Sequence, residues 1–469
     1  MNSLNNKRIG VAAHERREFL RRASALGLAG VAAPWALNLA ALGEAAAQSA
    51  PQDYKALVCV FLYGGNDHGN TLVPYDAASH AAYAQIRQTL ATPRDALTAT
   101  LLNPAAPLPD GRQMALAPQM GRLRAVFDAG RLGVLLNVGT LIQPTTMAQY
   151  KAQSVPLPPK LFSHNDQQSV WQSARPEGAT SGWGGRMGDL FLNSNATSTF
   201  TCINASGNAV FMAGQQAVQY QISSSGAVAI NGVTKPLFGS QACADALRSL
   251  ITAPRTHWME QELNRVTSRS VTAQATVSAA LASLPALQTS FPSGNSLAAQ
   301  LQMVARLIGS RSTLGARRQV FFVSLGGFDL HDFLADQHPG LLSNVSEALG
   351  AFHDALLELG VINQVTTFTA SDFGRTLSSN GDGSDHGWGS HHLLMGGALK
   401  PRSFFGQLPS VSVNGPDDVG QGRLLPTTSV DQLGATLAGW MGVGDSALAS
   451  VLPNIGNYSQ RSLPIFATA

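Results

Sequence analysis

The sequence predicts an α/β fold in which a mostly parallel central sheet is covered by helices on both faces. Apolar runs of strand length, such as 56–63 and 364–371, show little alternation with polar residues, which is typical of strands buried on both sides. Segments with helical spacing of apolar residues, such as 297–310, separate these runs. About 420 residues follow the N-terminal leader, which is enough for an ample core in one large domain or two.

Strands and helices are expected to alternate along the chain. The helix over 343–360 illustrates the reasoning, because a Ser or Asn cap opens it and Gly360 closes it. In order, the expected elements are the strand 56–63, the helix 120–130, the strand 132–138, the helix 297–310, the strand in 318–327, the helix 343–360, the strand 364–371 and the helix 427–443.

The middle of the chain differs in composition from the alternating parts. Residues 193–235 are rich in Ser, Asn, Gly, Gln and Ala with β-like alternation, which predicts an inserted β-rich cap or side sheet. Residues 273–296 are rich in Ala and Ser and contain two prolines, which indicates a helix followed by a surface connection. We expect a Gly-rich turn over 181–190, with Trp183 packed against the body.

Residues 1–47 resemble a twin-arginine (Tat) export signal. Arg16 and Arg17 precede a mildly apolar run, and Ala45 and Ala47 give the small-x-small pattern of a signal-peptidase site. The alternative is an N-terminal membrane anchor, but the apolar stretch is short, rich in glycine and broken by a proline, which favours cleavage. The domain is therefore expected to span 48–469 and to be periplasmic or otherwise exported, with no transmembrane segment in the mature chain.

Charge and cysteine content narrow the class of partner. The leader holds six of the 31 Lys+Arg and three of the 28 Asp+Glu residues, which leaves 25 basic and 25 acidic residues. This balance gives no electrostatic basis for binding nucleic acid or an anionic membrane. Cys59 is expected to be a buried strand thiol, whereas Cys202 and Cys243 either pair in an oxidising compartment or stay free.

Three of the expected strands end in an aspartate. Asp67 follows "VFLYGGN", Asp329 follows "VSLGGF" and Asp372 follows "FTAS". Because ligands bind at the carboxyl ends of strands in open parallel sheets, these acids are expected to share one edge. Carboxylates brought together stay ionised when a cation lies among them, and paired glycines let the backbone turn tightly beside a ligand. The alternative is that Asp and Gly are ordinary turn residues.

Histidines lie close to these acids in the sequence. His331 follows Asp329 by two residues, and the Gly-rich segment "DGSDHGWGSHH" contains His386, His391 and His392. Imidazole nitrogen together with carboxylate oxygen suits zinc or a similar divalent ion. The pattern favours a metal site over the alternative of an exposed polar loop.

Ser163 in "LFSHNDQQSVWQS" is the candidate nucleophile. A hydroxyl at a helix N-terminus faces free N–H groups and the positive end of the helix dipole, which suits phosphate or sulfate. Ser163 with Asp166 three residues on is equally a helix-capping pattern. His164 is a candidate for substrate or metal binding, Asn66 is a candidate substrate contact, and Arg375 either clamps an oxyanion or pairs with a nearby carboxylate.

The motifs together resemble the exported bacterial proteins grouped as domain of unknown function 1501. The stretches that carry the resemblance are the leader, "FLYGGNDHGNTLVPY", "LFSHNDQQSVWQS", "SGWGGRMGDL", "GGFDLHDF", "SDFGRT" and "DHGWGSHH". That family looks like a branch of the alkaline phosphatase–sulfatase superfamily. The resemblance implies an alkaline-phosphatase-like three-layer sandwich with one or two divalent ions at the strand ends, and zinc, calcium, manganese and magnesium all remain candidates.

The resemblance also implies roles for single residues. It makes Ser163 the nucleophile and suggests these metal ligands: Asp67, Asp329, His331, Asp372 and His386. In such a site we expect Arg375, or His391 and His392, to take the remaining oxyanion charge. Two departures from the superfamily pattern stand out. The Asp–His pair is spaced by two residues instead of four, and Phe373 occupies the place of the usual His, so that His164, Asp385 or His391 would replace a ligand.

The function predicted from the sequence is an exported, metal-dependent hydrolase of a phosphate or sulfate ester. The alternative is a non-catalytic periplasmic binding or assembly protein on a decayed alkaline-phosphatase-like fold, with another exported protein as partner. An enzyme should bring Asp67, Ser163, Asp372 and His386 into one pocket. A decayed site should show them apart or paired with Arg375.

Overall fold

A single parallel core of three strands organises the computed structural model, which describes residues 53–467. Strand β1 (Lys55–Leu62) lies between β7 (Arg318–Leu325) and β8 (Val365–Ser371) and is parallel to both. Cys59 of β1 is level with Phe322 and Phe368 of its two neighbours. The carboxyl ends of all three strands therefore meet at one edge, as the sequence predicts.

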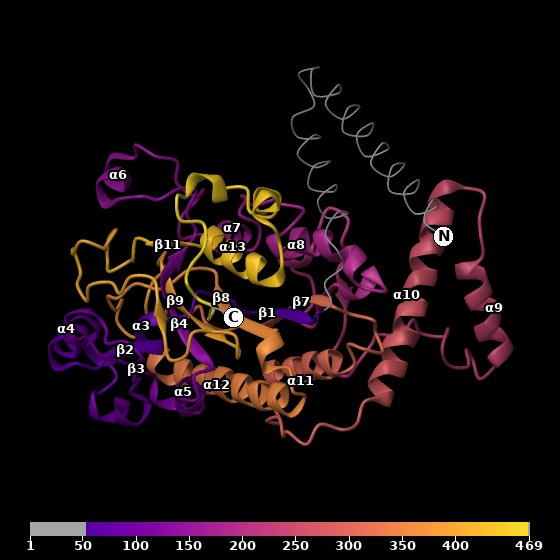
Figure 1. Cartoon of the computed structure of the whole chain (residues 1–469), viewed down its shortest axis with the longest axis horizontal. Helices are drawn as coiled ribbons and strands as arrows, with labels where there is room; N and C mark the ends of the chain where they lie inside the picture. Colours follow the sequence, from indigo (N-terminus) through magenta and orange to yellow (C-terminus); the bar gives the residue numbers. More distant parts are fainter. Residues whose placement is uncertain (1–52, 468–469) are drawn as a thin grey trace, which may run out of the picture.

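Six further strands complete a nine-stranded sheet in the order β10-β4-β9-β8-β1-β7-β5-β6, with β11 paired to β4 (Figure 1). Strand β9 is antiparallel to both β4 and β8, and the other pairings are parallel. The bounds of these strands are Leu132–Gly139 for β4, Cys202–Asn204 for β5, Tyr220–Gln221 for β6, Ser390–Met395 for β9, Phe404–Phe405 for β10 and Thr428–Ser429 for β11.

Helices cover both faces of this sheet (Figure 1). Side chains of β1 alternate between two apolar cores, because Val58 and Val60 belong to one and Cys59 and Phe61 to the other. The first core is closed by α5 (Gly121–Asp128), α11 (Ser296–Gly309) and α12 (Leu334–Glu358). The second is closed by α7 (His164–Ser173), α8 (Trp183–Phe191), α13 (Val430–Met441) and α14 (Leu448–Val451). The predicted three-layer α/β architecture with a mostly parallel sheet is confirmed.

The remaining elements are short or lie at the ends of the sandwich. They are α3 (His68–Thr71), α4 (Ala77–Arg87), α6 (Met147–Ala152), α9 (Gln241–Thr252), α10 (Trp258–Ser283) and the two-stranded sheet of β2 (Leu72–Pro74) and β3 (Met114–Leu116).

The middle segment 193–235 contributes to the main sheet. Its two strands, β5 and β6, extend the edge of the sheet beyond β7, and no separate cap sheet forms in this part of the structure. The expected turn over 181–190 is wrong, because Trp183–Phe191 form the helix α8. Its glycines serve close packing: a Cβ on Gly185 would lie 2.1 Å from the carbonyl carbon of Ala213.

Two further expectations are corrected by the packing. Helix α12 begins at Leu334, nine residues before the predicted cap, and includes Pro339. The helix continues through the proline because Leu334, His338 and Leu342 are all buried there, which outweighs one lost backbone hydrogen bond. Cys202 is buried and Cys243 is exposed, and both are free thiols, so the alternative of a disulfide between them is not realised.

The predicted Tat leader, 1–47, lies outside the described residues. Within the described residues, none of the helices has the length and apolar character needed to cross a membrane.

Candidate metal centre

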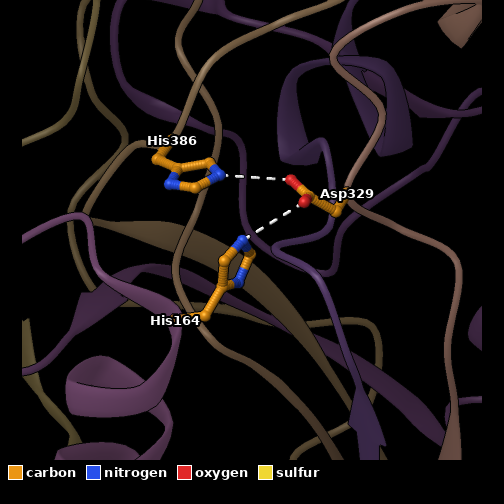
Figure 2. Close-up of side chains that lie close together, drawn as sticks. All are labelled: His164, Asp329 and His386. Atoms are coloured by element: carbon orange, nitrogen blue, oxygen red, sulfur yellow. Dashed lines mark hydrogen bonds and ion pairs between the residues drawn. The ribbon is translucent and has the colours of Figure 1, made fainter.

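Three side chains from distant parts of the sequence converge at the carboxyl edge of the sheet. One ligand atom each of His164, Asp329 and His386 lie within 4.8 Å of one another (Figure 2). Nε2 of His164 is 3.3 Å from Oδ2 of Asp329, and Nε2 of His386 is 3.1 Å from Oδ1 of Asp329. Two imidazoles and one carboxylate, aimed at a common point, are the donor set of many divalent-metal sites.

The strand ends and one helix start bring these residues together. Asp329 follows β7, His164 is the first residue of α7, and His386 lies in the loop between β8 and β9. The sequences that follow β1 and β7 are similar because both contain paired glycines, and Gly64 after β1 shows why a glycine is needed there. Gly64 has φ +113°, and a Cβ there would lie 2.4 Å from the backbone nitrogen of Asp329, so glycine lets the two strand-end loops touch.

Nδ1 of each of the two histidines, His164 and His386, lies within hydrogen-bond distance of an oxygen acceptor. Nδ1 of His164 lies 2.6 Å from Oδ2 of Asp372, and Nδ1 of His386 lies 2.7 Å from the carbonyl oxygen of Phe162. Gln168 donates a further hydrogen bond of 2.7 Å to Oδ2 of Asp372. This pattern favours a proton on each Nδ1 and directs both Nε2 atoms toward Asp329.

His331 stands next to the three converging residues. Its Nε2 is 3.0 Å from Oδ1 of Asp329 and 2.9 Å from Nε2 of His386. Its Nδ1 lies 3.3 Å from Oδ1 of Asp385, so this ring is also backed by an acid. His331 therefore offers a further ligand atom beside Asp329 and His386.

Arg375 binds the carboxylate at the centre of the cluster. Its Nη1 donates to Oδ1 of Asp329 at 2.7 Å, and the guanidinium is buried. Partial burial alone would raise the pKa of Asp329, but the hydrogen bond and charge of Arg375 and the nearby His164 and His331 lower it overall. Asp329 thus carries its negative charge at neutral pH.

The two converging histidines titrate in opposite directions. The hydrogen bond to Asp372 raises the pKa of His164 above its usual value, and partial burial opposes this. Partial burial lowers the pKa of His386, and the positive charges of His164 and Arg375 lower it further. The ring of Phe373 packs against both imidazoles, with its centroid 4.9 Å from that of His164 and 4.6 Å from that of His386.

Asp67 lies outside this cluster. Its Oδ2 is paired with Arg87 and accepts from Oγ of Ser384 at 3.1 Å, while Oδ1 caps helix α3 through the N–H of Asn70. Burial opposes ionisation, yet Arg87 and the neighbouring His338 lower the pKa of Asp67 to about 2. Its predicted role as a metal ligand stays a prediction, and in this structure the carboxylate serves as a buried ion-pair partner.

The predicted substrate contacts Asn66, His391 and His392 are part of the interior. Nδ2 of Asn66 donates to Thr71, and its Oδ1 lies 2.9 Å from Nε2 of His338. His391 and His392 belong to the buried strand β9 instead of the expected loop. Burial lowers the pKa of both histidines, to about 3 for His392, so both are neutral at physiological pH.

Ser163 is the N-cap residue of α7, directly before His164. Its hydroxyl donates to Oδ2 of Asp166 at 3.0 Å and makes no cap hydrogen bond to the helix backbone. The capping alternative is therefore not realised in its usual form. The first-turn N–H groups of α7 receive no side-chain cap from Ser163, and the hydroxyl is half-buried beside them.

One known protein family matches most of the chain. Residues 54–450 match the family described as "Protein of unknown function (DUF1501)". The chain belongs to the DUF1501 family. No curated protein matches the sequence.

Solved structures with which this DUF1501 chain aligns include a sulfatase, a lipoteichoic acid synthase and an alkaline phosphatase. The PsFucS1 sulfatase from Pseudoalteromonas sp. aligns at TM-score 0.32 and 8% identity, over 78% of this chain and 67% of that one. The lipoteichoic acid synthase LtaP from Listeria monocytogenes aligns at TM-score 0.31 and 8% identity, over 85% and 76%. A mutant of the alkaline phosphatase PafA aligns at TM-score 0.26 and 12% identity, over 70% and 64%.

Some of the predicted residues meet in this family member and others do not. The structure brings together these predicted residues: His164, Asp329, His331, Asp372, Arg375 and His386. It keeps Asp67, Asn66, His391 and His392 in separate contacts. Sequence reasoning missed Gln168, although its position four residues after His164 puts both on one helical face. It also missed Arg87, for which no local signal exists.

Proposed function

We propose that this DUF1501 protein is an exported, metal-dependent hydrolase of a phosphate or sulfate ester. The observation that carries the proposal is the convergence of Nε2 of His164 and Nε2 of His386 on the carboxylate of Asp329, with both Nδ1 atoms held by acceptors. Export is proposed from the Tat-like leader alone.

The residues fit a divalent ion. Nε2 of His164 is buried and makes no hydrogen bond within the described residues, and the same is true of Oδ1 of Asp372 behind it. The contact of this nitrogen is the 3.3 Å ion pair with Oδ2 of Asp329, and an ion bound between the two atoms would give both of them a ligand bond. Two imidazoles favour zinc or manganese over calcium and magnesium, which prefer all-oxygen sites.

His164, Asp329 and His386 would hold the ion, and His331 lies beside Asp329 and His386. A divalent ion bound there would supply Lewis-acid polarisation of an ester oxygen. Asp372 holds the proton on Nδ1 of His164 and so presents Nε2 toward the site. Arg375 holds Asp329 in place, and because the guanidinium is buried it is a positioning residue here instead of the predicted oxyanion clamp.

We assign the attack on the ester to Ser163, which directly precedes His164 at the start of α7. Its Oγ–H donates to the carboxylate of Asp166, which can accept the proton as Oγ bonds to phosphorus or sulfur, the bond to the ester oxygen breaks and the alcohol leaves. The uncapped first-turn N–H groups of α7 suit the oxygens of a tetrahedral phosphate or sulfate. The ester class itself follows from this helix terminus and from the resemblance of the motifs.

One observation favours the second candidate, a non-catalytic binding protein. Asp329 is paired with Arg375 and Asp67 with Arg87, and paired strand-end acids are what a decayed site would show. The hydrolase remains the better-supported proposal, because Nε2 of His164 and Nε2 of His386 converge on the one carboxylate of Asp329, as ligands of a shared ion would.

The test is metal content and activity of the exported protein purified without chelator. We expect one divalent ion per chain by mass spectrometry and hydrolysis of 4-nitrophenyl phosphate or sulfate that EDTA abolishes. Asp329→Asn and His386→Gln should lose the ion, whereas Asp336→Asn, an exposed acid seven residues from Asp329, should keep it. Protein that binds neither zinc nor manganese would favour the binding-protein candidate.

A further inference from the structure

Exposed apolar side chains gather in one part of the molecule. Nine of the eleven large exposed apolar residues in the described part of the chain lie between 218 and 266, around α9 and α10 at the side of the sandwich (Figure 1). They are Val218, Val228, Ile230, Phe238, Leu250, Trp258, Met259, Leu263 and Val266. A gathering of this kind marks an interaction surface.

Helix α10 shows why this surface is uncovered. The α10 stripe (Met259, Leu263 and Val266) has spacings of four and three residues and forms one helical face. The same face continues to Ala273 and Val277, which are buried against the body. The helix therefore runs past the edge of the core, and its first half leaves Met259 and Leu263 at 59% and 64% exposure.

A second row of side chains runs beside the stripe. The α10 flank (Trp258, Glu262, Arg265 and Arg269) has spacings of four, three and four residues. The spacings in this row are the same when read from either end. In an antiparallel pair of α10 helices, Glu262 is level with Arg265 of the other helix at the register that also sets Trp258 level with Arg269.

We propose that this surface binds a second copy of the chain, through antiparallel pairing of the two α10 helices about a two-fold axis. The two-fold axis keeps each flank opposite its own copy, so both Glu–Arg pairs and both Trp–Arg contacts form at once. Within one chain Glu262 pairs with Arg265 at 2.8 Å and lies near the charge of Arg269, whose side chain makes no hydrogen bond or ion pair to any described residue. The second copy supplies a second arginine for Glu262 and an aromatic ring for Arg269.

A groove beside the stripe fits the same register. It encloses about 490 Å³ and is lined by Val266, Arg269 and Ala273 of α10 and by Val218 and Ile230 of the segment before α9. Trp258, which is 72% exposed, would reach this groove on the second copy when it lies level with Arg269. Because Trp258 and the groove lie on the same surface of one chain, each chain fills the groove of the other, and the assembly is complete with two chains.

The experiment measures mass in solution by sedimentation velocity over a range of micromolar concentrations, using the full chain. We expect wild type at twice the 49.1 kDa chain mass. Leu263→Asp should weaken the dimer at least about tenfold, because a charge enters the centre of the stripe. Circular dichroism should be unchanged, since residue 263 is exposed and outside the core.

Charge reversal then tests the register. Glu262→Arg and Arg265→Glu should each weaken self-association at least about tenfold, because like charges then face each other. An equimolar mixture of these two variants should dimerise again, because every facing pair in the mixed dimer is opposite in charge. Recovery on mixing cannot come from the intrahelical pair, which stays like-charged in both chains.

Two results would overturn the proposal: a monomeric wild type at every concentration, or no recovery on mixing. If such a monomer binds vesicles of anionic phospholipid and loses this binding with Leu263→Asp, the surface belongs to a membrane contact instead. The proposal is independent of the metal centre, and Asp329→Asn should dimerise like wild type.

Discussion

Nδ1 of His164 lies 2.6 Å from Oδ2 of Asp372, which makes the strand-end acid a support for a histidine at the start of another element. The sequence marks Asp372 as a ligand, but its Oδ2 already accepts from His164 and Gln168. The converging atoms belong instead to His164, Asp329 and His386. Four predictions test the support role of Asp372, the role of Asp67, the buried histidines and the packing of Gly65.

Removing the charge behind His164 should weaken metal binding without abolishing it. Asp372→Asn keeps an acceptor oxygen but no longer stabilises the proton on Nδ1, so the affinity should fall about 10–100-fold. Asp329→Asn should remove it altogether. Because Asp372 raises the pKa of His164, protons compete with metal as pH falls, and this competition should shift to lower pH in Asp372→Asn. Calorimetric zinc titrations across pH measure both effects; equal affinities in wild type and Asp372→Asn would contradict the support role.

Asp67 should behave as a structural residue. Asp67→Ala leaves the buried guanidinium of Arg87 unpaired and should cost about 3–5 kcal/mol in the free energy of unfolding. The folded variant should bind zinc with the wild-type affinity. Urea denaturation and zinc titration on the same sample measure the two quantities. If stability is unchanged and zinc binding is lost, Asp67 is the ligand that the sequence predicts.

Mild acid should destabilise the fold through buried histidines. Burial lowers the pKa of His68 and His338 to about 4 and of His392 to about 3, from an ordinary value of 6.5. The unfolded chain then binds more protons than the folded one below pH 6.5, so stability is lost as pH falls from about 6.5 toward 4. Urea denaturation at several pH values should show this slope. His338→Gln should reduce the slope, whereas His257→Gln, at an exposed site, should not.

Gly65 should tolerate no side chain. Its φ is +81°, and a Cβ would lie 2.5 Å from the Phe373 ring that supports His164 and His386. Gly65→Ala should destabilise the fold by more than the roughly 1–3 kcal/mol of backbone strain and should weaken metal binding as well. Gly294→Ala is the matched control, because Gly294 has φ +74° with open space around it. Equal thermal shifts in the two variants would contradict the proposed contact with Phe373.

The elements that sequence reasoning placed well have strong local signals. The expected strands 56–63 and 364–371 match β1 and β8 to within one residue, because their apolar runs are continuous. The expected turn over 181–190 failed because helix α8 uses glycines for contact with residues 210–214, a neighbour that no local pattern reveals. His391 was placed in a loop because "GSHH" looks polar, although its Nδ1 accepts from the buried N–H of Asn137.

By itself the sequence determined that parallel strands end together and that acids and histidines occupy those ends. It could do so because local runs of apolar residues indicate which strands are buried and where they end. Only the tertiary structure decided which of these groups meet. Asp67 and Asp329 follow similar strand endings, yet one faces Arg87 and the other faces His164 and His386. The interaction between charged groups depends on distance in space, and residues 20 to 165 positions away along the chain supply it.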